Sequence, residues 1–220
     1  MSKTTALALL TVATMQVALA QVGGGDIHNV NSSIQVAAGE HSGGLSTVNG
    51  SIHVGENAVV GSARTVNGGL QLLPHATSGD LVSVNGGIDL KEGVHVNGNV
   101  RTVNGGLHVD NSVEVTGDLT NVNGDIGIAA AHIGGSVNTA SASMDLGPNA
   151  HIDGNIHMSK DNSWHFGFQT IPRVVIEPGT VVKGILHFER PVSLYVSDRA
   201  TIGTVEGAEV HKFSGDHPPK

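Results

Sequence analysis

A short unit recurs along most of this chain and limits what it can fold into. The unit starts 18, 18, 18, 19, 19 and 18 residues apart. So short a period cannot hold a helix–loop–helix or a four-stranded blade, but it fits one coil of a β-solenoid, whose coils bury their apolar faces by stacking. The copies are NVNSSIQV from Asn29, TVNGSIHV from Thr47, TVNGGLQL from Thr65, SVNGGIDL from Ser83, TVNGGLHV from Thr102, NVNGDIGI from Asn121 and the degenerate TASASMDL from Thr139.

Each repeat encodes three short strands. Leu107–Val109 and Val113–Val115 alternate apolar and polar residues, which is typical of strands with one buried face. Gly-containing segments separate them at corners. A third stretch closes the coil, and in the 19-residue repeats the additional residue, in Val100–Val103, predicts a bulge or a wider corner. We therefore predict an all-β, single-stranded, three-sided β-helix of about nine coils. We expect these inward residues to stack in two neighbouring coils: Val66, Leu70, Leu72, Val84, Ile88 and Leu90.

An asparagine occupies the same position of six repeats. Stacking should place these residues ~4.8 Å apart, where side-chain amides bond to the copies above and below. A ligand-binding row is the alternative, but we interpret the column as a structural ladder. Its members are Asn31, Asn49, Asn67, Asn85, Asn104 and Asn123.

The chain divides into five segments. Residues 1–20 have the features of a secretory signal peptide: Lys3, an apolar stretch too short to span a membrane, and an Ala18-Leu19-Ala20 cleavage site. The lack of cysteine rules out disulfides despite the oxidising destination. We predict β-helix repeats at 21–157, an aromatic insertion at 158–172, final β-helix coils at 173–210 and a disordered tail at 211–220.

Charge and aromatic residues both change character near residue 158. From Gln21 to His157 there are 12 acidic and 3 basic residues, and all six aromatic residues follow His157. The repeat core is therefore aliphatic. An acidic solenoid lacks the basic surface that nucleic-acid binding requires, so we predict no nucleic-acid partner.

The recurrent TVNGG and TVNGD units resemble those of secreted β-strand-repeat, adhesin-like proteins. The coil length, the small aliphatic core and segments such as HVNGNV and IEPGTVVKGIL are similar to those of bactofilins. That resemblance implies a right-handed, three-sided β-helix that polymerises end to end. Bactofilins are typically cytosolic and lack this chain's signal and insertion. Apolar residues six positions apart also resemble the hexapeptide repeat of left-handed β-helices, some of which are enzymes, but the 19-residue coils favour the right-handed form.

Four outward residues on the second strand of consecutive coils form a candidate metal site. Imidazole and carboxylate groups on adjacent coils lie ~5 Å apart at Cβ, so one divalent transition metal could bridge them. An exposed polar ladder is the alternative. The residues are His95, Glu114, His132 and His151, and a second outward column contains Gln71, Asp89 and His108.

The sequence favours a protein that is not an enzyme. It contains no nucleophile elbow, zinc-protease motif or phosphate-binding loop, and its turns are too short to build a cleft. In the insertion, Trp164, Phe166 and Phe168 could cover the solenoid flank or contact a partner, glycan or membrane.

We therefore expect an exported, non-enzymatic structural or adhesive solenoid, periplasmic or at the cell surface, with no transmembrane segment after signal cleavage. We expect it to associate with itself or with the cell envelope. A metal- or glycan-binding module that uses the His column or the insertion is the alternative.

Overall fold

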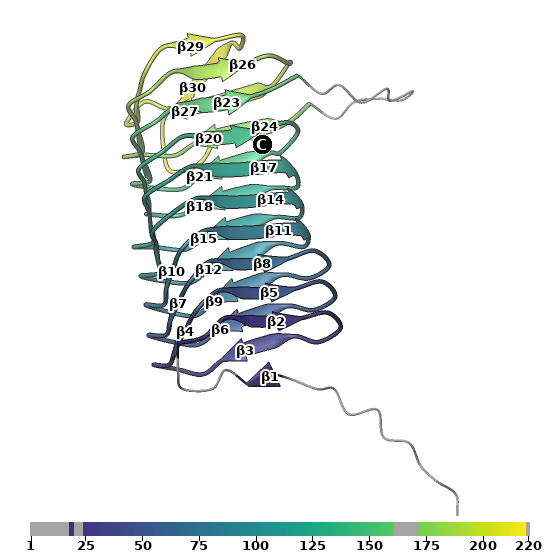
Figure 1. Cartoon of the computed structure of the whole chain (residues 1–220). Coiled ribbons are helices and arrows are strands. Elements are labelled where there is room, and N and C mark those ends of the chain that lie inside the picture. Colours follow the sequence, from purple (N-terminus) through teal and green to yellow (C-terminus); the bar gives the residue numbers. More distant parts are fainter. Residues whose placement is uncertain (1–17, 20–23, 161–170, 219–220) are drawn as a thin grey trace, which may run out of the picture.

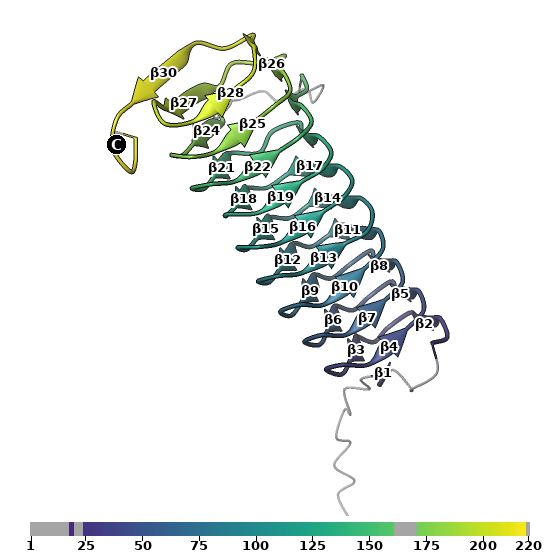
Figure 2. The same ribbon diagram turned by 90° about the vertical axis from the view of Figure 1, so that its left-hand side faces the viewer.

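The computed structural model describes residues 18–19, 24–160 and 171–218 and consists of three parallel β-sheets around one core. Figures 1 and 2 show the coils stacked into a rod, with one strand of each coil in each sheet. The described residues contain no helix, and about nine coils recur roughly 19 residues apart. The predicted all-β, three-sided solenoid is confirmed.

Each sheet collects the same strand of successive coils. The first sheet contains β1 (Ala18–Leu19), β3 (Ile34–Val36), β6 (Ile52–Val54), β9 (Leu70–Leu72), β12 (Ile88–Leu90), β15 (Leu107–Val109), β18 (Ile126–Ile128), β21 (Met144–Leu146), β24 (Arg173–Ile176), β27 (Ser193–Ser197) and β30 (Val210–Phe213). The second contains β4 (His41–Ser42), β7 (Val59–Val60), β10 (Thr77–Ser78), β13 (His95–Val96), β16 (Glu114–Val115), β19 (His132–Ile133), β22 (His151–Ile152), β25 (Val181–Val182) and β28 (Thr201–Ile202). The third contains β2 (Ile27–Asn29), β5 (Leu45–Thr47), β8 (Ala63–Thr65), β11 (Leu81–Asn85), β14 (Val100–Asn104), β17 (Leu119–Asn123), β20 (Val137–Thr139), β23 (Ile156–Met158), β26 (Leu186–Phe188) and β29 (Val205–Glu206).

The register stacks like residues in the core. Leu70 pairs with Ile88 and Leu72 pairs with Leu90, all four of them buried, as the repeat alignment predicted. The apolar core residues are Val, Ile, Leu, Ala and Met as far as Met158, and Phe188 and Phe213 join them in the last coils.

The third sheet differs from the prediction in which residues face inward. Val66 and Val84 are half-exposed, while the residues before them, Thr65 and Ser83, are fully buried. The buried hydroxyl of Thr65 donates to the Gly50 carbonyl at 2.7 Å, and Ser83 does the same to Gly68 at 2.9 Å. These bonds satisfy corner carbonyls of the preceding coil, so a polar residue is the better inward choice. The six-residue spacing of apolar residues therefore does not describe this face.

Two corners of the coil use glycine for different reasons. After each third-sheet strand, the backbones of adjacent coils approach so closely that a Cβ on Gly86 would overlap the Gly68 carbonyl oxygen. Between the first and second sheets, the same turn position instead has positive φ and is occupied by Gly39, Asn57, His75, Gly93, Ser112, Asn149 and Gly179. This second position recurs with residues that tolerate the left-handed region, whereas positive φ occurs after the third-sheet strands only at Gly124 and Gly207 among the described residues.

The additional residue of the 19-residue coils lies in the corner between the second and third sheets. Ser78 pairs with Val96 and Leu81 pairs with Val100, so two corner residues become the three residues 97–99. The extra residue therefore widens the corner before Val100, and β14 runs without a bulge. Side chains at this corner form a ladder that the sequence did not reveal. Backbone N–H groups of the next coil donate to Asp80 (2.7 Å), Asn99 (3.0 Å), Asp118 (2.7 Å), Ser136 (3.0 Å) and Asn155 (2.8 Å).

The two ends of the rod also differ from expectation. β1 lies inside the predicted signal segment and pairs with β3. At the other end the predicted boundary of a disordered tail at 211 is wrong, because β30 includes residues 211–213 and Phe213 is 5% exposed. Beyond β30, Arg199 contacts Asp216 at 2.8 Å and His217 contacts Glu177 at 3.2 Å.

Candidate functional site

The six repeat asparagines form one continuous ladder. Each side-chain amide donates to the side-chain oxygen of the preceding Asn, at 2.8–3.0 Å, from Asn49 to Asn123. Ser141 continues the column by donating to Asn123 at 2.8 Å. The amides are exposed, but their hydrogen bonds are made to one another, which is the geometry expected of a structural ladder.

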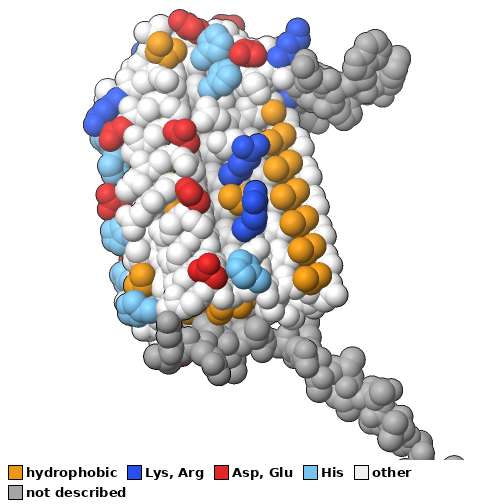
Figure 3. All heavy atoms as spheres, in the orientation of Figure 1, with side chains coloured by type: hydrophobic (Ala, Val, Ile, Leu, Met, Phe, Trp, Pro, Cys, Tyr) orange, Lys and Arg blue, Asp and Glu red, His pale blue; other side chains and the backbone are white. Residues whose placement is uncertain are grey.

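A column of valines runs beside this ladder on the outside of the molecule. Val30 is 62% exposed and Val48 is 40% exposed, and the equivalent residues of the next coils are half-exposed. Figure 3 shows the column as a row of hydrophobic side chains along one edge. Its members are Val30, Val48, Val66, Val84, Val103 and Val122.

The predicted metal column occupies paired positions of four consecutive second-sheet strands. His95 pairs with Glu114, Glu114 with His132, and His132 with His151. The side chains divide into two groups. His95 Nδ1 contacts Glu114 Oε2 at 3.2 Å, whereas the rings of His132 and His151 meet edge to face with centroids 5.4 Å apart.

Asp153 lies next to His132 and His151, and the sequence-based site did not include it. Its carboxylate contacts Nε2 of both His132 and His151, each at 3.1 Å. Lys183 Nζ also lies 2.7 Å from Asp153 Oδ1. The Lys183 ammonium and then the His132 imidazole lower the pKa of this carboxyl from 3.8 to about 2. The two-residue alternation of a strand could have revealed Asp153, which follows outward His151 and inward Ile152.

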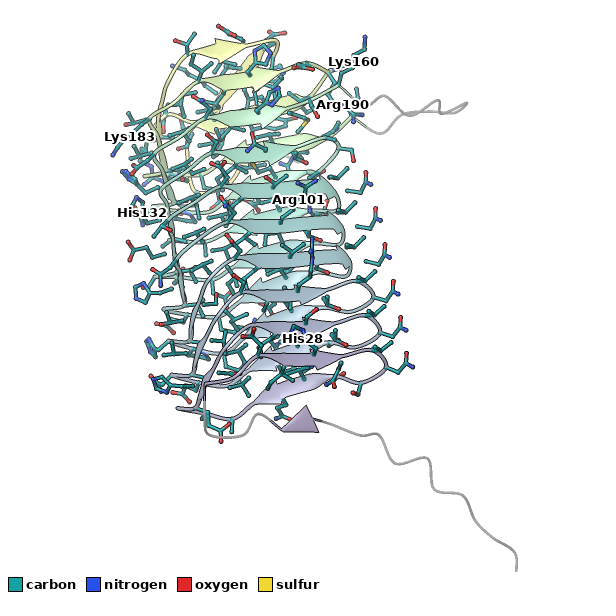
Figure 4. The ribbon with its side chains drawn as sticks, viewed as in Figure 1. His28, Arg101, His132, Lys160, Lys183 and Arg190 are labelled. Atoms are coloured by element: carbon teal, nitrogen blue, oxygen red, sulfur yellow. The ribbon has the colours of Figure 1, made fainter. Side chains whose placement is uncertain are left out.

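Figure 4 places His132 and Lys183 along one edge of the ribbon, away from His28 and Arg101, which project from the third sheet. His132, His151 and Asp153 offer three ligand atoms within 4.8 Å of one another. The group could hold a metal ion, but a cation would compete with Lys183 for the carboxylate.

A second group of the same kind lies on the third sheet and includes no residue of the predicted site. His157, His187 and Glu189 also offer ligand atoms within 4.8 Å of one another. The two histidines are 30 residues apart in sequence, because the segment after β23 breaks the repeat. Repeat alignment therefore could not place them side by side.

The structure describes fewer contacts for the remaining predicted sites. Trp164, Phe166 and Phe168 lie outside the described residues. The second outward column is present: Gln71 contacts His53 at 3.3 Å and Asp89 at 3.4 Å, and Asp89 pairs with His108. These side chains line an open hollow of about 390 Å³. The hollow has no hydroxyl or thiol nucleophile held by a base among its described lining residues.

Comparison of the chain with protein-family models, curated proteins and solved structures finds no match. The adhesin-like and bactofilin-like resemblances therefore stay predictions. In the described part of the chain, no helix has the length and apolar character needed to cross a membrane.

Proposed function

We propose that this protein is an exported, non-enzymatic structural or adhesive rod of the bacterial cell envelope. The observation that supports it most is how the repeated polar residues are used. The Asn ladder, inward third-sheet hydroxyl groups such as that of Ser83, and the second corner ladder hydrogen-bond within the fold. Residues repeated through the regular coils therefore maintain a rigid stack, which a spacer or scaffold needs. About nine coils at ~4.8 Å give a rod of roughly 43 Å.

Self-association through the N-terminal end is part of the proposal. Cleavage after Ala20 would remove β1 and leave β3 as the edge strand of the first sheet. An uncovered edge presents unpaired N–H and C=O groups that can pair with another strand. At the other end, the larger side chains of Phe188 and Phe213 are buried in the last coils.

Two measurements test this proposal. Fractionation of cells that express the whole chain should recover protein beginning at Gln21 outside the cytoplasm. Analytical ultracentrifugation and electron microscopy of this mature chain should show dimers or small oligomers. Retention of the whole chain in the cytoplasm would refute export. A strict monomer at high concentration would refute self-association, and long filaments would show that the C-terminal end does not limit growth.

Metal binding on the second sheet is a second candidate function, favoured by the approach of Asp153 to His132 and His151. If this group is the site that binds, Zn²⁺ or Cu²⁺ should raise the melting temperature with concentration, and His132→Ala should remove that shift. An unchanged melting temperature at millimolar metal would exclude it.

A further inference from the structure

Two histidines from neighbouring coils converge with one glutamate on the outer face of the third sheet. His157 in β23 pairs with His187 in β26, and their ring centroids lie 5.5 Å apart. His157 Nε2 lies 3.0 Å from Glu189 Oε1, and His187 Nε2 lies 3.9 Å from the same oxygen. All three side chains are 37–44% exposed, so solvent and ions can reach them.

Two further contacts orient His187 and Glu189. Glu206 Oε2 lies 2.9 Å from Nδ1 of His187, which leaves Nε2 directed at Glu189. The backbone N–H of Lys160 donates to the other Glu189 oxygen, Oε2, at 3.1 Å. A carboxylate on the far nitrogen of a histidine is the usual support of a metal-binding imidazole, because it sets the tautomer and the ring orientation.

We propose that His157, His187 and Glu189 bind one Zn²⁺ ion, with Glu206 as a positioning residue. Ligands of a tetrahedral zinc ion at ~2.0–2.1 Å are roughly 3.4 Å apart, which lies between the two observed N···O separations. Three protein ligands leave a fourth position for water or an external ligand. Binding displaces the proton that His157 Nε2 donates to Glu189, and the charges of Glu189 and Glu206 balance that of the ion.

The group on the second sheet is the weaker competitor for zinc. There the Lys183 ammonium contacts the Asp153 carboxylate at 2.7 Å, so an incoming cation must displace a resident one. On the third sheet, a neutral backbone N–H makes the contact to the second oxygen of Glu189. Zinc can therefore bind Glu189 Oε1 without displacing the N–H from Oε2. We expect zinc to occupy the third-sheet group before the second-sheet group.

The position of this group suggests what the ion contributes. His157 and His187 belong to the two coils that the 30-residue interval joins. A shared zinc ion would link β23 to β26 across the place where the repeat is interrupted. This role does not depend on the proposed export or self-association.

The test uses the whole metal-free chain. Titration with Zn²⁺, followed by calorimetry and thermal unfolding, should show one ion bound per chain and a rise in melting temperature. His187→Gln and His157→Gln should each abolish both effects. His132→Gln, a matched change on the second sheet, should leave them intact. Glu206→Gln should weaken binding by about 10- to 100-fold. Mg²⁺ should have no effect, because it prefers oxygen ligands.

Circular dichroism is the folding control. Because the substituted side chains are exposed, each variant should keep its β structure. Zinc binding that survives both His157→Gln and His187→Gln would overturn the proposal. So would the absence of binding at millimolar Zn²⁺, or its loss in His132→Gln alone.

Discussion

The regular coils and the last coils fill the same core column with different chemistry. In the third sheet one inward position carries Thr47, Thr65, Ser83, Thr102, Asn121 and Thr139 in successive coils, and then Met158 and Phe188. All of these side chains are at most 4% exposed. The column therefore changes from polar to apolar where the short corner after the third sheet gives way to the insertion.

This inward position is polar where a hydrogen-bond acceptor lies beside it in the preceding coil. From Thr47 to Asn121 the side chain donates to a corner carbonyl of the preceding coil, as Thr102 does to Gly86 at 2.9 Å. In the coil that precedes Phe188, the 30-residue interval replaces this four-residue corner, so Phe188 has no repeated corner carbonyl to meet; Met158 follows the last corner of ordinary length, residues 140–143. A buried hydroxyl without a partner is unfavourable, so an apolar side chain is the better occupant. Repetition of a corner and polarity of the core beside it are thus coupled.

Truncation of the apolar part of the column should have the largest effect. Phe188→Ala should lower the free energy of unfolding by about 3–5 kcal/mol, since it leaves a cavity in the core. Chemical denaturation measures this, with Phe188→Leu as a control that should cost less than about 1.5 kcal/mol. Equal losses in the two variants would contradict the packing role.

Removal of a hydroxyl from the polar part should have an intermediate effect. Thr102→Val keeps the shape but leaves the Gly86 carbonyl without this donor, so we expect a loss of about 1–3 kcal/mol. Its neighbour Val103 is half-exposed, and Val103→Thr should change stability by less than about 0.5 kcal/mol. A larger loss in Val103→Thr would mean that the inward and outward residues are reversed.

The Asn ladder, which only the regular coils possess, should contribute less per residue. Asn85→Ala removes two ladder bonds, one to Asn67 and one from Asn104. At about 0.5–1 kcal/mol for each bond, the free energy of unfolding should fall by about 1–2 kcal/mol. Asn31 makes one ladder bond, so Asn31→Ala should cost about half as much. Equal losses at both positions in urea unfolding would indicate that the ladder is not additive.

The smallest effect concerns acid stability at the boundary between the two regions. The lowered pKa of Asp153 means that its carboxylate stabilises the folded state above about pH 3.8, and this contribution is lost as the pH falls towards about 2. Melting temperatures of wild type and Asp153→Asn should therefore differ at about pH 5 and converge near about pH 2. Lys183→Met should reduce that difference. A gap between the two melting curves that stays constant over this range would contradict the assignment.

Much of the architecture could be predicted because the repeat is short and regular. The spacing of the Thr-Val-Asn units was enough to identify three strands per coil, the stacking of Leu70 on Ile88 and the common position of the asparagines. With one coil aligned to the next, residues a repeat apart must be neighbours in a parallel stack. That argument needs only the sequence.

The tertiary structure decided what spacing cannot. In the Thr-Val-Asn unit, the valine is the more apolar residue, but the corner carbonyl of the coil below makes the threonine or serine the inward one. The convergence of His157, His187 and Glu189 depends on how the chain returns to register after a 30-residue interval, which no repeat encodes. Sequence periodicity determined which residues recur, whereas the tertiary structure determined which polar atoms hydrogen-bond to one another.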